Sequence, residues 1–132
     1  MQELQRWRDY LDLPLTLEPK HFPVSDKLAA AMVIKLREQQ VVSALRLAGA
    51  CLRACWVEEK DISDRNTLLA IASENQLDGE ELLSAAEQAP QIIAADSEAA
   101  VKRGVFGAPS YLYDKQIFWG QDRLDFLDRA LE

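Results

Sequence analysis

Two short segments near the carboxyl end of the chain combine residue types that could hold a small charged molecule. Gly120-Gln121-Asp122 precedes a predicted helix, where free N–H groups attract a carboxylate, and the Asp122 side chain could pair with an ammonium group. In Ala108-Pro109 the residue before proline favours extended geometry, so its backbone N–H and C=O could pair with an extended peptide. Two simpler interpretations stay open: Asp122 as a helix N-cap, and Gly107-Ala108-Pro109 as an ordinary loop.

The two cysteines and the single histidine favour structural roles. Cys51 and Cys55 are four residues apart, about one turn of a predicted helix, and this is not the C-x-x-C spacing of dithiol oxidoreductases. A metal site would need further soft ligands, and His21 is the only histidine. We therefore expect two buried thiols, a surface or packing histidine, and no metal site.

The charge and hydropathy of the chain exclude two classes of partner. The formal net charge is −7, which argues against a nucleic-acid binder because such proteins need clustered Lys and Arg. The longest apolar stretch is interrupted by Arg46 and Arg53, so nothing reaches the roughly 20 apolar residues of a membrane span. The polar first residues are unlike a signal peptide, and a cytoplasmic protein is expected.

Apolar periodicity and capping residues predict about seven helices. They are expected at 2–12, after a cap at Ser25 or Asp26, at about 41–57, after Asp64, from Asp78 to about 87, from Pro90 to about 103 and from Asp122 onward, with Asp64 and Asp78 as N-caps. In the longest helix the expected inward face is formed by Leu45, Ala48, Leu52 and Cys55. Alternating leucines at 13–17 predict a short irregular strand, because Pro14 interrupts them.

A β-hairpin is predicted near the carboxyl end. Its two β-prone runs are Ser110–Tyr113 and Gln116–Trp119, separated by the two residues Asp114-Lys115. A lone hairpin is only marginally stable in water, and both runs carry large side chains on both faces. We therefore expect further strands, supplied from outside this chain, to complete the sheet.

Three segments together resemble one family. They are Trp56-Val57-Glu58-Glu59-Lys60-Asp61-Ile62-Ser63, Gly104-Val105-Phe106-Gly107-Ala108-Pro109-Ser110-Tyr111, and Phe118-Trp119-Gly120-Gln121-Asp122-Arg123-Leu124. They are similar to the 2-hydroxychromene-2-carboxylate isomerases, close relatives of kappa-class glutathione transferases in the DsbA-like thioredoxin-fold group. The resemblance implies an α/β, thioredoxin-like fold formed by 1–17 and 104–132, with an inserted all-helical domain at 18–103.

The resemblance also implies a gap. Family members begin with a strand–helix–strand unit that carries the catalytic serine, and nothing before Trp7 matches that unit. The chain is therefore expected to lack the first part of the thioredoxin sheet and to contain no catalytic residue of its own. By itself it is expected to be inactive.

The resemblance assigns glutathione to the two candidate segments. It implies that Ala108 and Pro109 form a cis-proline loop whose backbone binds the cysteinyl part. It implies that Gln121 and Asp122 contact the γ-glutamyl group, which carries an ammonium and a carboxylate on one carbon. The implied activity is a glutathione-dependent isomerisation of a small aromatic substrate by a homodimer. Aromatic residues could line its pocket or belong to the core: Trp7, Trp56, Trp119, Phe106 and Tyr111.

Two other functions remain open. The chain could be a non-catalytic helical interaction module whose free hairpin edge pairs with another chain. It could also be part of a DsbA-type thiol-disulfide oxidoreductase, which would need a C-x-x-C motif in a segment that these residues do not contain.

Overall fold

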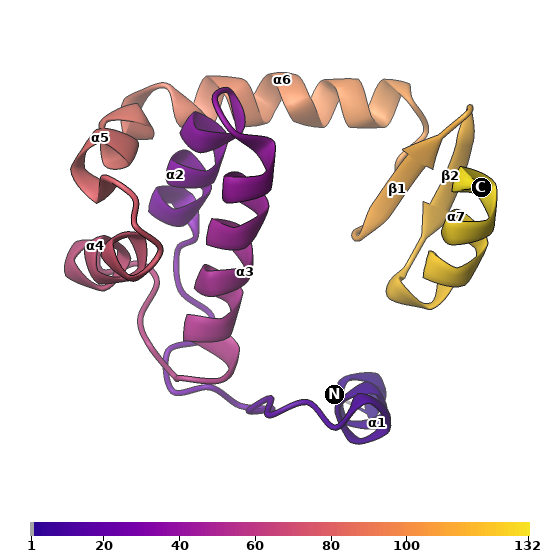
Figure 1. Ribbon diagram of the computed structural model, residues 1–132, viewed down its shortest axis with the longest axis horizontal. Coiled ribbons are helices and arrows are strands. Elements are labelled where there is room, and N and C mark those ends of the chain that lie inside the picture. Colours follow the sequence, from indigo (N-terminus) through magenta and orange to yellow (C-terminus); the bar gives the residue numbers. More distant parts are fainter. Residues whose placement is uncertain (1) are drawn as a thin grey trace. The chain divides into compact units, whose positions relative to one another are not determined.

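The chain folds into two compact units, Met1–Ile92 and Ile93–Glu132 (Figure 1). The computed structural model describes residues 2–132. The first unit is helical, and the second contains most of one long helix, a hairpin and the last helix. The expected division at residues 17 and 103 concerns the complete thioredoxin-like fold, and it stays a prediction.

The first unit is built on a small helical core. Its helices are α1 (Gln2–Leu11), α2 (Lys27–Arg37), α3 (Val41–Trp56), α4 (Arg65–Glu74), α5 (Gly79–Leu83), the 3-10 helix η1 (Ser84–Glu87) and the start of α6 (Ala89–Lys102). Helix α2 packs against α3 and α5, and α4 covers α3 and α5. The largest fully buried side chains are Met32, Leu47 and Leu68. This core fixes α2 to α5 as one body.

Two predicted N-caps are confirmed. The Asp64 carboxylate accepts a hydrogen bond from the Thr67 amide at 2.8 Å, at the start of α4. The Asp78 carboxylate accepts one from the Glu81 amide at 3.0 Å, at the start of α5. These short local signals place both helix starts, because each side chain satisfies an amide that has no partner inside the helix.

Two expectations about this unit are wrong. Leu45 and Leu52, expected to point inward, are 69% and 60% exposed, whereas Leu47 is fully buried. The apolar side chains of α3 cover a wide sector opposite Arg46 and Arg53, so the pattern does not decide which part of that sector is buried. The expected strand at 13–17 does not form: the Thr16 amide donates to the Trp56 carbonyl at 2.8 Å and ties an irregular connector to the end of α3.

The second unit contains the predicted hairpin. Strands β1 (Ser110–Tyr113) and β2 (Gln116–Trp119) pair antiparallel, with Tyr111 opposite Phe118. Asp114 and Lys115 have φ values of 43° and 64°, and two positive values in a two-residue loop define a type I′ turn. The 3-10 helix η2 (Gln121–Arg123) leads into α7 (Leu124–Leu131), which packs on both strands.

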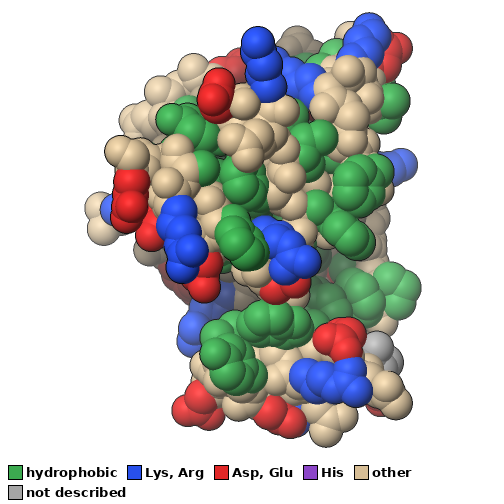
Figure 2. All heavy atoms as spheres, turned by 90° about the vertical axis from the view of Figure 1, so that its right-hand side faces the viewer, with side chains coloured by type: hydrophobic (Ala, Val, Ile, Leu, Met, Phe, Trp, Pro, Cys, Tyr) green, Lys and Arg blue, Asp and Glu red, His purple; other side chains and the backbone are tan. Residues whose placement is uncertain are grey.

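The second unit has no core of its own. None of residues 93–132 is buried; all are exposed or half-buried. Figure 2, seen from the side on which Figure 1 draws β2 and α7, shows apolar side chains at the surface of these elements. A two-stranded hairpin with one helix cannot cover both faces of its strands. No helix among residues 2–132 is long and apolar enough to cross a membrane.

Candidate functional site

The structure brings the two candidate segments together. The Gly120 amide donates a hydrogen bond to the Pro109 carbonyl at 2.9 Å, one residue before Gln121 and one residue after Ala108. The Ala108–Pro109 peptide bond is cis, as is the Phe22–Pro23 bond in the first unit. The Ser110 hydroxyl donates to the Gly107 carbonyl at 2.6 Å and holds the loop to the start of β1. The open end of the hairpin therefore carries both segments.

The backbone of Ala108 is available to a ligand. Ala108 is exposed, and within residues 2–132 neither its N–H nor its C=O has a hydrogen-bond partner. Backbone polar groups are strong donors and acceptors, and an unpaired, outward-facing pair is what an extended peptide uses when it adds to a strand. The structure thus leaves room for the expected backbone contact.

Asp122 is not a helix N-cap. It lies inside η2, whose N-cap is Gly120, and α7 is preceded by Arg123; neither start has a side-chain capping bond. Instead the Asp122 carboxylate accepts from the Arg123 guanidinium at 2.7 Å. The extra 3-10 turn moves the N-cap position of the α-helix by one residue, from Asp122 to Arg123. Both side chains are about half exposed, so the carboxylate also faces solvent.

Two glycines fit this site because they have no side chain. Gly120 has a φ of +100°, a conformation that other residues rarely adopt, and a Cβ there would lie 2.5 Å from Asp122 Oδ1. A Cβ on Gly107 would lie 2.6 Å from Trp119 Nε1. Neither glycine was predicted to position the site, although each lies directly beside a predicted segment, Ala108-Pro109 or Gln121-Asp122.

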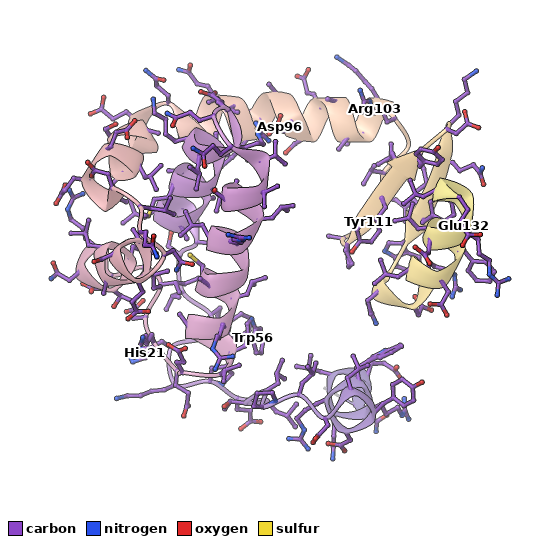
Figure 3. All side chains as sticks on the ribbon, in the orientation of Figure 1. His21, Trp56, Asp96, Arg103, Tyr111 and Glu132 are labelled. Atoms are coloured by element: carbon purple, nitrogen blue, oxygen red, sulfur yellow. The ribbon has the colours of Figure 1, made fainter. Side chains whose placement is uncertain are left out.

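The aromatic candidates fall into separate groups. The ring centroids of Phe106 and Trp119 are 5.0 Å apart, beside the Ala108-Pro109 loop. Trp56 packs against Phe22 at 4.5 Å, at the end of α3 where Figure 3 also shows His21. Trp7 contacts Tyr10 within α1. Only the first pair adjoins the candidate site.

The thiols are buried, as expected. Cys51 and Cys55 are free and lie in the core, and desolvation by burial raises the pKa of both thiols. The nearby Asp61 carboxylate raises the pKa of Cys55 further. Because the thiolate is the nucleophile, both groups are kept in their unreactive form. Among residues 2–132, no group of three or more His, Cys, Asp or Glu side chains could hold a metal ion.

His21 has no arrangement for nucleophilic catalysis. Its Nδ1 lies 3.9 Å from Asp61 Oδ2, but the Ser63 hydroxyl donates to Asp61 at 2.6 Å rather than to the histidine. The Ser63 amide also donates to Asp61, at 2.8 Å. These bonds from Ser63 hold the pKa of Asp61 below its ordinary value. The hydrogen bonds between Ser63 and Asp61 fix the turn before α4.

We expect Asp61→Asn to destabilise the chain in a pH-dependent way. The native pKa of Asp61 is lowered, so its contribution is complete above the unfolded-state value of about 3.9 and disappears as the pH falls through the native pKa. Urea unfolding at pH 7 should show a lower midpoint for the variant, and at pH 3 the difference should shrink. Asp26→Asn is the control, since the Asp26 side chain makes no capping bond. If the difference in urea midpoint between the native chain and Asp61→Asn were the same at pH 3 as at pH 7, the ionised Asp61 carboxylate would not be its cause.

The comparisons with known proteins identify the family and the fold. The model of the DSBA-like thioredoxin domain matches residues 1–132. This chain belongs to that family. The DSBA-like thioredoxin domain is 37% identical over 135 residues to a 2-hydroxychromene-2-carboxylate isomerase from Sphingobium xenophagum, covering 99% of this chain and 66% of that protein.

A solved structure shows the same fold. It is that of a selenomethionine-labelled 2-hydroxychromene-2-carboxylate isomerase, with a TM-score of 0.76 and 21% identity, covering 98% of this chain and 62% of that one. The expected α/β, thioredoxin-like fold with a helical insert is therefore confirmed. This DSBA-like thioredoxin domain spans slightly less than two thirds of the length of these two relatives.

Proposed function

We propose that this chain provides the glutathione-binding part of an isomerase that acts on a small aromatic carboxylate, in the manner of the relatives named for 2-hydroxychromene-2-carboxylate. One observation carries the proposal. The hydrogen bond from the Gly120 amide to the Pro109 carbonyl sets the free Ala108 backbone beside Gln121 and Asp122. This combination suits glutathione, which has an extended peptide backbone and carries an ammonium and a carboxylate on one carbon of its γ-glutamyl group.

Each part of glutathione has a matching group. The cysteinyl N–H and C=O pair with the backbone of Ala108, as in strand addition. The Asp122 carboxylate holds the γ-glutamyl ammonium, and Gln121 offers an amide to the neighbouring carboxylate. The thiolate then adds to a conjugated carbon of the substrate, and the electron pair of the double bond moves into the conjugated system. The resulting single bond rotates, the electron pair returns to re-form the double bond, and the thiolate leaves with the electron pair of the C–S bond.

The activating group is not among these residues. The resemblance places the serine that stabilises the thiolate in a strand–helix–strand unit that no part of residues 1–132 matches. We therefore expect the 132-residue polypeptide by itself to bind glutathione without isomerising the substrate. The proposal extends to a homodimer, which the resemblance implies, and to the cytoplasmic location expected from the sequence.

A second candidate function is favoured by the exposed second unit. Both edges of the hairpin are free within residues 2–132, and free edges pair readily with other strands. A non-catalytic interaction module would use this property and would not need glutathione. A DsbA-type oxidoreductase would need cysteines other than the two buried ones.

Calorimetric titration with glutathione tests the proposal. A charge-assisted hydrogen bond contributes about 1.5–3 kcal/mol, so Asp122→Asn should weaken binding about tenfold or more. Glutaryl-cysteinylglycine lacks the ammonium, so it should bind the native chain as weakly as glutathione binds Asp122→Asn. Its affinity should be the same for the native chain and for the variant. Asp125→Asn is the control, because Asp125 is an exposed aspartate in the first turn of α7, three residues after Asp122.

Absence of binding at millimolar glutathione would overturn the proposal. If the same sample formed a stable dimer in sedimentation equilibrium, the interaction module would be the better description. Equal weakening in Asp122→Asn and Asp125→Asn would show that general charge, rather than the Asp122 site, attracts the peptide.

A further inference from the structure

We infer that a hollow on the free edge of β2 binds the aromatic carboxylate, with Arg123 holding the carboxylate and Trp119 and Phe126 packing against the ring. The inference rests on the proposed function and names the residues that would select its substrate class. The hollow has a volume of about 370 Å³ and lies wholly within the second unit. Its lining consists of Ile117, Phe118, Trp119, Arg123 and Phe126.

The walls of the hollow suit a planar ring. Trp119 is 52% exposed and Phe126 57% exposed, so both present large apolar surfaces. The Trp119 ring is held from behind by Phe106 and by the backbone of Gly107. Ligand pockets are typically about 300–1,000 Å³ and are lined by apolar and aromatic groups with a few polar ones. A bicyclic aromatic molecule fits this size and chemistry.

The polar groups of the hollow suit an anion. Hydrogen bonds in an antiparallel pair alternate along a strand, and the Gly120 amide points toward β1. The amides of Ile117 and Trp119 therefore point toward the free edge, and so do their carbonyl oxygens. Arg123 offers five N–H donors, of which only those on Nη1 are used for Asp122. The remaining guanidinium donors of Arg123 are the groups here that suit a carboxylate.

The hollow adjoins the candidate glutathione site. Trp119 lines the hollow and also touches Gly107, the residue before Ala108. Arg123 lines it and also binds Asp122. Arg123 therefore contacts Asp122, which is proposed to hold glutathione, and Trp119 contacts the residue next to Ala108. A ring bound there lies beside the peptide that supplies the thiol.

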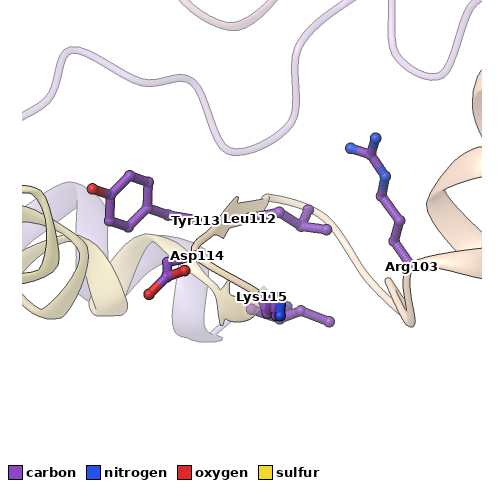
Figure 4. A pocket seen from close by; sticks show the side chains of 6 residues that line it. Arg103, Leu112, Tyr113, Asp114 and Lys115 are labelled. Atoms are coloured by element: carbon purple, nitrogen blue, oxygen red, sulfur yellow. The ribbon is translucent and has the colours of Figure 1, made fainter.

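A second hollow in the same unit provides a matched control. It has a volume of about 400 Å³, contains Arg103 and Lys115, and lies at the turn end of the hairpin (Figure 4). The candidate glutathione site is at the open end, where Pro109 meets Gly120. Arg103 is an exposed arginine in the same unit, so Arg103→Gln makes the same chemical change away from the proposed subsite.

The test is a titration of the full chain with coumarin-3-carboxylate, a stable bicyclic acid, and with the neutral coumarin-3-carboxamide. Proton–nitrogen spectra follow the Trp119 indole N–H, and calorimetry gives the affinity. We expect Arg123→Gln to weaken binding of the acid about tenfold, the effect of roughly 1.4 kcal/mol, and to leave the carboxamide unchanged. Phe126→Ala should weaken the binding of both ligands, and Arg103→Gln should change the binding of neither.

Three results would overturn the inference: no binding of the acid to the native chain, equal losses in Arg123→Gln and Arg103→Gln, or a dimer that protects the Trp119 indole from the ligand. A glutathione titration of the same sample separates this inference from the proposed function. If the chain binds glutathione but not coumarin-3-carboxylate, the inferred subsite is wrong and the proposed function is unaffected. Coumarin binding without glutathione binding supports the subsite and removes the proposed function.

Discussion

Replacing Leu47 by alanine is expected to lower the free energy of unfolding by about 2–5 kcal/mol, the range for a buried leucine whose removal leaves a cavity. Leu47 is fully buried in the core that α3 shares with α2, α4 and α5. Domains are typically stable by only about 5–15 kcal/mol, so the loss removes a large part of the reserve of the first unit. Urea unfolding of the full chain, followed by helical circular dichroism, measures it.

Leu45→Ala is the matched control. Leu45 lies two residues away on the same helix, but it is 69% exposed, and alanine is at least as good a helix former as leucine. We expect a change within about 0.5 kcal/mol, as for ordinary surface substitutions. If Leu45→Ala were as damaging as Leu47→Ala, the exposed side of α3 would be an interface in solution.

This pair also shows where sequence reasoning about the fold succeeds and fails. The caps at Asp64 and Asp78 were predicted correctly because a side chain and an amide three residues later decide them. The inward face of α3 was not, because leucine, valine, alanine and cysteine cover a wide sector of the helix. Which face is buried is then decided by α2 and α4, and no local pattern contains that information.

The candidate site was predictable to a similar extent. The hairpin and the segments around Ala108 and Asp122 follow from local signals together with the family resemblance. The role of Asp122 as an N-cap was wrong, since a 3-10 turn comes between Gly120 and α7. The packing of Trp119 on Gly107 could not be predicted, because it joins the end of β2 to the proline loop through a side-chain contact rather than through a backbone pattern.

Gly120→Ala is expected to weaken glutathione binding at least tenfold. The φ of +100° and ψ of 154° belong to a region that is almost restricted to glycine, and occupying it with another residue costs about 1–3 kcal/mol. The new Cβ would also lie 2.5 Å from Asp122 Oδ1, so the carboxylate proposed to hold the ammonium must move. Calorimetry measures the affinity, and proton–nitrogen spectra show whether the shifts of β1 and β2 are retained.

Gly49→Ala separates this local effect from the general effect of a methyl group. Gly49 lies within α3, and nothing lies within 4 Å of its Cβ position. Alanine there should stabilise the helix by about 0.5–1 kcal/mol and leave glutathione affinity unchanged. Unchanged affinity in Gly120→Ala would mean that the peptide does not depend on the Asp122 carboxylate in this position. The site would then have to be sought away from the junction of the proline loop and η2, because that junction can hold Asp122 in place only with a glycine before Gln121.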